Sequence, residues 1–167
     1  MKDSTNICLA CGICCDGTLI GFVEVSAIEL ERLKGVKKVE TKDGHGFFLQ
    51  PCDKYCNGCT IYSQRPKHCD SFNCKLLKSV QEKKLHFDVA VKIVDDAKSK
   101  THAIEKKIAA LQIALKSPSF YFKMVELKKV INRLEEKSNL TSAYQALRID
   151  LEELDELLLE NFGVTMD

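Results

Sequence analysis

The chain has 167 residues, of which 45% are hydrophobic, and a net charge of +1 at pH 7. This length and composition allow one compact domain with an appendage, or two small domains. The balanced charge gives no overall electrostatic reason to bind nucleic acid or an anionic membrane surface. No apolar run reaches the roughly 18 residues that mark a membrane-spanning helix, so we expect no membrane association.

All nine cysteines lie between Cys8 and Cys74, and the first four form the motif Cys8-x2-Cys11-x2-Cys14-Cys15. The amino-terminal segment lacks the basic and apolar regions of a secretory signal, which predicts a cytoplasmic protein. Thiols stay reduced there, and clustered cysteines then favour metal binding over disulfides. The odd cysteine count and the adjacent Cys14 and Cys15 also argue against a disulfide framework, which remains the alternative.

Short elements are predicted between the two cysteine blocks. They are a strand at 18–25, a helix that opens with the capping box 26–29 and ends at Gly35, and a hairpin with strands at 36–40 and 46–50 around Asp43-Gly44. Elements of this length bury little apolar surface. A bound metal would therefore supply part of the folding free energy.

The second cysteine block comprises Cys52, Cys56, Cys59, Cys69 and Cys74. Soft thiolate ligands select zinc, copper(I) or iron-sulfur clusters over magnesium or calcium. Zinc sites commonly use two C-x2-C knuckles, and Cys56 with Cys59 would form one. The first block instead repeats cysteines every three residues, like the first three ligands of a bacterial ferredoxin cluster. This pattern favours an iron-sulfur cluster of the 4Fe-4S type over zinc.

The other candidate chemistry is sparse. None of the four histidines pairs with another at helical spacing, and only His68, next to Cys69, is a substitute metal ligand; an ordinary structural role is the stronger interpretation. No Ser-His-Asp or H-E-x-x-H arrangement is present. The sequence gives no independent argument for enzymatic activity.

The cysteine-free remainder shows helical periodicity. Apolar residues at steps of three and four predict a long helix at about 87–116 and a hairpin of helices at about 119–137 and 140–161. Residues 98–133 carry nine Lys or Arg, whereas residues 135–167 carry nine Asp or Glu. These opposite charges predict antiparallel helices whose basic and acidic flanks face each other. Such pairing argues against nucleic-acid binding by the basic stretch.

The cysteine blocks resemble the CxxCxxCC family, described as a zinc- or iron-chelating domain. The matching motifs are Cys8-x2-Cys11-Gly12-x-Cys14-Cys15 and, after Cys52, Cys59-Thr-Ile-Tyr62-Ser-Gln-Arg65-Pro66-x2-Cys69-x4-Cys74. The resemblance covers roughly residues 5–78. It implies eight metal-binding cysteines: Cys8, Cys11, Cys14, Cys15, Cys52, Cys59, Cys69 and Cys74. Cys56 is an addition and a further candidate ligand, and Asp70 stands where the family usually has arginine.

Two residues between the second-block cysteines are expected to support the site. Arg65 is predicted to hydrogen-bond cluster sulfurs or carbonyls from outside the ligand set. Tyr62 is predicted to pack nearby with its hydroxyl as a hydrogen-bonding tip. Some relatives in the family are flagellin lysine-N-methylases, in which a methyl group passes from S-adenosylmethionine to lysine, but this likeness is confined to the cysteine blocks.

The sequence thus predicts an α+β protein, mainly α. A small cysteine-rich domain with short strands (residues 1–78) is expected to precede a helical extension (residues 79–167). The expected function is metal binding, with an iron-sulfur cluster in a redox, sensing or accessory role. The alternatives are a zinc-stabilised interaction module and a component of a protein lysine methylation system. The helical extension is the expected surface for a protein partner.

Overall fold

The computed structural model describes residues 6–166. Residues 1–5, which the prediction about a secretory signal concerns, and Asp167, one of the acidic residues counted above, lie outside the described residues. The fold is α+β and mainly α, as predicted. The described helices are α1 (Ile7–Cys11), α2 (Ala27–Leu33), α3 (Lys67–Ser71), α4 (Lys75–Gln81), α5 (Phe87–Ala110), α6 (Phe120–Glu136) and α7 (Ser142–Phe162), with a 3-10 turn η1 (Tyr62–Gln64); the strands are β1 (Phe22–Val25), β2 (Glu40–Lys42) and β3 (His45–Leu49).

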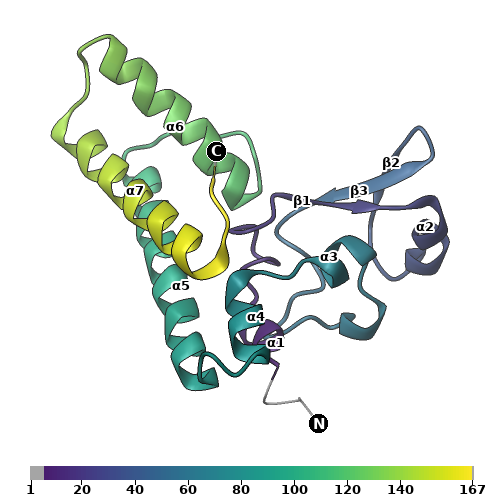
Figure 1. The fold of residues 1–167 in the computed structure, drawn as a ribbon. Helices are drawn as coiled ribbons and strands as arrows, with labels where there is room; N and C mark the ends of the chain where they lie inside the picture. Colours follow the sequence, from purple (N-terminus) through teal and green to yellow (C-terminus); the bar gives the residue numbers. More distant parts are fainter. Residues whose placement is uncertain (1–5, 167) are drawn as a thin grey trace.

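The elements form two regions with the cysteine-bearing helices between them. Figure 1 shows α5, α6 and α7 on one side, the sheet with α2 on the other, and α1, α3 and α4 between. Among residues 6–166, no helix has both the length and the apolar composition needed to cross a bilayer.

The three strands form an antiparallel sheet in the order β1-β3-β2. Val23 of β1 pairs with Phe48 of β3, and both are buried because alternate side chains of a strand face the core. The predicted hairpin between β2 and β3 is confirmed. Its turn residues Asp43 and Gly44 both have positive φ, 51° and 80°, as a two-residue hairpin turn requires.

Two predicted strands begin later than expected. β1 begins at Phe22, because the backbone N–H of Thr18 donates to the carbonyl of Ile13 instead of to a neighbouring strand. β2 begins only at residue 40, the last residue of the predicted strand 36–40. The N–H of Val36 donates back to the carbonyl of Leu33 and so extends the end of α2.

The long helix α5 ends at Ala110, earlier than the predicted end near residue 116. The chain leaves the helix at Gln112, whose φ of 54° is left-handed. Leu115 follows the helical periodicity in the sequence, yet it packs on the core from the connection to α6. The carboxylate of Glu126 accepts a hydrogen bond from the N–H of Ser117 at 3.1 Å and so replaces a helical partner. Periodicity alone does not distinguish these two ways of burying an apolar residue.

The predicted pair of helices is present as α6 and α7. Their buried seam residues are Phe120, Met124, Leu127 and Ile131 of α6 and Leu147, Leu151, Leu154, Leu158 and Phe162 of α7. The acidic face of α7 meets lysines, as predicted, but on both neighbouring helices. Its ion pairs are Glu153 with Lys100 and Asp150 with Lys107 of α5, and Asp155 with Lys128 of α6. The facing charges therefore join α7 to α5 as well as to α6.

The cysteine-bearing elements and the long helices share one hydrophobic core. α1 packs against α4 and α5, and α4 also packs against α7. Gly21, just before β1, leaves room for the ring of Phe122, since a Cβ at this position would come within 3 Å of the ring. The domain boundary at residue 78 stays a prediction.

Candidate metal centre

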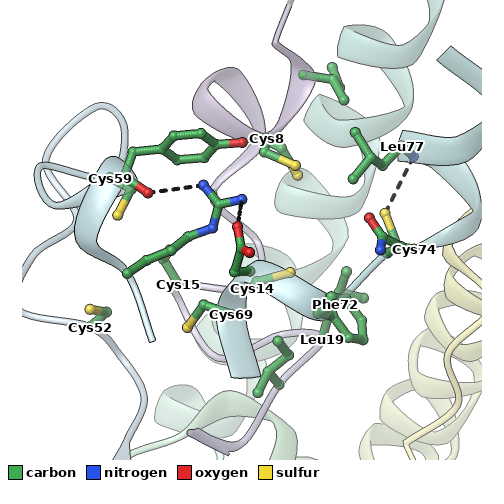
Figure 2. Close-up of a pocket in the computed structure, with 18 of the residues that line it drawn as sticks. Cys8, Cys14, Cys15, Leu19, Cys52, Cys59, Cys69, Phe72, Cys74 and Leu77 are labelled. Atoms are coloured by element: carbon green, nitrogen blue, oxygen red, sulfur yellow. Dashed lines mark hydrogen bonds and ion pairs between the residues drawn. The ribbon is translucent and has the colours of Figure 1, made fainter. Parts of the chain in front are cut away.

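A cavity of about 500 Å³ lies among α1, α3, α4 and the loops that follow α1 and β3. Eight cysteines line it: Cys8, Cys11, Cys14, Cys15, Cys52, Cys59, Cys69 and Cys74. These are the eight that the family resemblance implies as ligands. Figure 2 shows the cavity with most of these thiols labelled. Cys56 is exposed and does not line the cavity, and none of the nine cysteines forms a disulfide.

Four of the cavity thiols come from α1, the turn after it and the residue that caps α4. We call Cys8, Cys11, Cys14 and Cys74 the helix group. Asn6 caps α1, because its Oδ1 accepts a hydrogen bond from the N–H of Cys8 at 3.0 Å. α1 ends at Gly12, whose φ of 74° costs glycine no strain. At α4, the Sγ of Cys74 accepts a hydrogen bond from the N–H of Leu77 at 3.4 Å.

The other four thiols come from loops and from the short helix α3. We call Cys15, Cys52, Cys59 and Cys69 the loop group. The N–H of Cys52 donates to the carbonyl of Cys15 at 2.7 Å, which joins the loop after β3 to the turn after α1. Cys59 pairs with Tyr55 in an isolated β-bridge that closes its loop. Cys69 lies in α3, which begins directly after Pro66.

The position of α3 depends on Glu29 of α2. The predicted capping box is confirmed, because the N–H and the hydroxyl of Ser26 both donate to the Glu29 carboxylate, at 3.0 and 2.7 Å. The second carboxylate oxygen accepts a hydrogen bond from the N–H of Lys67 at 2.6 Å. One carboxylate thus caps α2 and holds the first residue of α3, the helix that carries Cys69.

Burial makes several of the cavity thiols weaker acids than a free cysteine. It raises the pKa of Cys11, Cys15 and Cys69 from the ordinary value of 9.0 to about 12. The pKa of Cys14 is raised well above 9.0 for the same reason, although part of its side chain faces the cavity. In the metal-free protein these thiols are protonated at neutral pH. A metal must therefore displace protons when it binds.

Arg65 and Tyr62 line the cavity together. The Arg65 guanidinium lies 3.7 Å from the centre of the Tyr62 ring and donates to the Tyr62 carbonyl at 3.0 Å. It also pairs with Asp70 at 2.6 Å, so the residue that departs from the family pattern holds Arg65 in place. The Tyr62 hydroxyl accepts a hydrogen bond from Asn6 Nδ2 at 2.8 Å. A positive charge and a phenol therefore lie beside the thiols.

The structure places His68 outside the cavity wall. Its Nδ1 accepts a hydrogen bond from the N–H of Glu24 at 3.1 Å, so the ring joins α3 to β1. The sequence analysis did not identify other residues of the wall, among them Gln50 and the apolar Leu19 and Phe72. Gln50 is buried, and its Oε1 has no hydrogen-bond partner within the described part of the chain. No local pattern marks these residues, because only the tertiary fold brings them to the thiols.

The described thiols are not arranged as the ligands of one metal ion. Within residues 6–166, no three His, Cys, Asp or Glu side chains are placed to hold one metal ion together. Thiolates on zinc lie about 2.3 Å from the metal, and therefore within about 4 Å of one another. Iron and sulfide ions hold the thiolates of a cluster farther apart.

The fold and the cavity define an α+β protein with a buried site lined by thiols. Comparison with known protein families, with curated proteins and with solved structures finds no match. The resemblance to the CxxCxxCC family therefore stays a prediction from the cysteine spacing.

Proposed function

We propose that this chain binds an iron-sulfur cluster through its cavity thiols and has a redox, sensing or accessory role. The observation that carries the proposal is the gathering of eight cysteines around one cavity, from which the exposed Cys56 is absent. Cysteines spread over the sequence from Cys8 to Cys74 meet there, and thiolates are the usual ligands of iron-sulfur clusters.

Cationic side chains near the thiols support the same proposal. Against the larger effect of burial, Arg65 lowers the pKa of Cys8 and Lys98 lowers the pKa of Cys11. Positive charges of this kind favour thiolates and offset the negative charge of a thiolate-bound cluster. Charge and hydrogen bonds around cluster sulfurs also set the reduction potential, which suits a redox or sensing role.

The cytoplasm is the compartment that we propose for this protein, because reducing conditions there keep cysteines available as thiols until a cluster is inserted. A zinc-stabilised interaction module is the alternative within the same ligand chemistry. A methyl-transfer role and a protein partner for α5, α6 and α7 stay predictions from the sequence.

Metal analysis of protein purified without oxygen tests this proposal. We expect a brown protein that contains iron and acid-labile sulfide. The double variant Cys11→Ser/Cys69→Ser removes one thiol from each group and is expected to lose both. The matched control is Cys56→Ser, which removes an exposed thiol outside the cavity and is expected to retain the wild-type content.

Two results would overturn the proposal in different ways. A colourless protein with bound zinc and no iron would replace the cluster with a zinc-stabilised module. A wild-type protein without either metal, or a double variant that keeps its full metal content, would exclude the cavity thiols as ligands.

A further inference from the structure

A second pocket, of about 210 Å³, lies between the turn that follows α1, the helix α5 and the start of α6. The turn contributes Asp16 and Thr18, and α5 contributes Lys98, Thr101, His102 and Glu105. None of these residues lines the thiol cavity. At about 30 Å³ for each water molecule, the pocket has room for a molecule of only a few heavy atoms.

The walls of this pocket are fixed by local hydrogen bonds and by helical spacing. The polar residues of α5 recur at steps of three and four, so they share one face of the helix. The backbone N–H of Tyr121 donates to the carbonyl of Gly17 at 2.7 Å and so joins α6 to the turn. Within the turn, the N–H of Thr18 donates to Asp16 Oδ1 at 2.9 Å. The pocket is therefore formed before any ligand enters it.

Two opposite charges in the pocket have no ion-pair partner within residues 6–166. These are the carboxylate of Asp16 and the ammonium group of Lys98, whereas Glu105 is paired with Lys123 at 3.6 Å. A ligand with one charge would match one of the two groups and take water from the other, which costs free energy. A ligand that carries both charges matches both groups.

The hydroxyl groups of the pocket can bind the same ligand. Thr18 is fully buried, and its Oγ1 makes no hydrogen bond of ordinary geometry in the described part of the chain. Against the larger effect of burial, this hydroxyl lowers the pKa of Asp16, so it lies near that carboxylate. The hydroxyl of Thr101 donates to the carbonyl of Ala97 at 2.9 Å and can still accept a hydrogen bond. A buried hydroxyl without a partner is unfavourable, and a polar ligand would remove that cost.

We propose that this pocket binds a small zwitterion, a molecule of the size of a free α-amino acid with one carboxylate and one ammonium group. Lys98 pairs with the carboxylate of the ligand, and Asp16 accepts hydrogen bonds from its ammonium group. The Thr18 hydroxyl supplies a further hydrogen bond. The proposal is independent of metal binding, since the two sites share no lining residue.

Calorimetric titration of the full chain at pH 7 and constant ionic strength tests this proposal. The probes are glycine and alanine, with acetate and methylammonium as compounds that carry only one of the two charges. We expect glycine or alanine to bind at least about tenfold more tightly than either single-charge compound. No binding of either amino acid would overturn the proposal. Equal affinity for an amino acid and acetate would also overturn it, because it would indicate an anion site.

Two variants test which charge each residue recognises. Lys98→Met removes the partner of the carboxylate, so glycine should bind no better than methylammonium. Asp16→Asn keeps an Oδ1 acceptor for the N–H of Thr18 but removes the charge, so glycine should bind no better than acetate. The matched control is Lys92→Met, at an exposed position of α5 outside the pocket, which should bind like the wild type. Unchanged binding in Lys98→Met and in Asp16→Asn would place the ligand elsewhere.

Thr18→Val separates a role in binding from a role in the fold. Valine has a similar shape but lacks the hydroxyl, so we expect weaker binding of glycine. The melting temperature of the ligand-free protein should stay the same or rise, because an unpartnered buried hydroxyl is lost. A lower melting temperature with unchanged binding would show that the hydroxyl serves the fold, and would contradict its place in the site.

Discussion

Gly12 and Gly35 have the same backbone conformation but different surroundings. Both have a φ of 74°, in the left-handed region. A Cβ at Gly12 would overlap the ring of Tyr55, whereas a Cβ at Gly35 would meet no atom within 4 Å. Tyr55 belongs to the loop that carries two thiols of the loop group. The close approach of that loop to α1 therefore depends on the missing side chain of Gly12.

We expect Gly35→Ala to lower the free energy of unfolding by about 1 kcal/mol, the cost of a left-handed conformation for alanine. Gly12→Ala should lower it by about 1 to 3 kcal/mol more, because the Tyr55 ring must move. Urea unfolding of the reduced, metal-free protein measures both effects. Equal losses of unfolding free energy in the two variants would show that the Tyr55 ring moves without a free-energy cost.

Glu29 is expected to make the stability of the protein sensitive to acid. Burial alone would raise its pKa, but hydrogen bonds from Ser26 and from the N–H of Lys67 lower it below the ordinary value of 4.5. The ionised carboxylate therefore adds stability above pH 4.5, and this contribution is lost as the pH falls through the lower value in the folded state.

Glu29→Gln should therefore destabilise the protein at neutral pH by about 1.5 kcal/mol, the low end of the range for hydrogen bonds to a charged group. The difference from the wild type should shrink below pH 4.5. Denaturant unfolding over a pH series measures it. Glu31→Gln, at an exposed position of α2, is the matched control and should have little effect at any pH. If Glu29→Gln loses the same stability at every pH, the loss comes from altered packing and not from the charge of Glu29.

At the scale of the element, adjacent leucines of α7 provide a direct comparison. Leu158 is fully buried, whereas Leu159 is 53% exposed. We expect Leu158→Ala to cost about 2 to 5 kcal/mol, through lost burial and the cavity left behind. Leu159→Ala should change stability by no more than about 0.5 kcal/mol. Chemical unfolding monitored by circular dichroism measures both, and similar losses would contradict the packing of α7 on its neighbours.

The long helices were predicted from the sequence more accurately than the short strands. α6 and α7 were predicted closely, since every seam residue from Phe120 to Leu158 repeats at helical spacing over many turns. The short strands were displaced, because Thr18 and Val36 make hydrogen bonds to neighbouring turns that no periodicity reveals. The end of α5 was missed because Leu115, which fits the helical spacing, stays in contact with the core after the helix has ended.

At the scale of the whole molecule, metal removal should affect the two regions unequally. The cysteine-bearing elements are short and surround the cavity, so the proposed bound group would supply part of their stability. The seam of α6 and α7 is buried without any contribution from the thiols. Hydrogen exchange before and after chelation should therefore show lost protection in α1, α3 and α4, with α6 and α7 retained. Equal loss in all these helices would show that the metal supports the entire core.

The sequence predicted which cysteines line the cavity, but it did not predict how they are arranged around it. Spacing and resemblance identified the same eight cysteines that line the cavity and set Cys56 apart. The division into helix and loop groups depends on how α4 and α3 fold back toward the turn after α1. Cys14 continues the three-residue spacing of Cys8 and Cys11, whereas Cys15 is joined to Cys52 by a backbone hydrogen bond that spacing does not reveal.

Cys74, which caps α4, also determines when the site can be completed during synthesis. It lines the same cavity as Cys8, although Cys8 lies 66 positions earlier in the sequence. At about 5 to 20 residues per second, the ribosome adds Cys74 roughly 3 to 13 seconds after Cys8. For that interval the cavity lacks one of its eight thiols. The proposed cluster can therefore take the full set of cavity thiols only after the start of α4 has been translated.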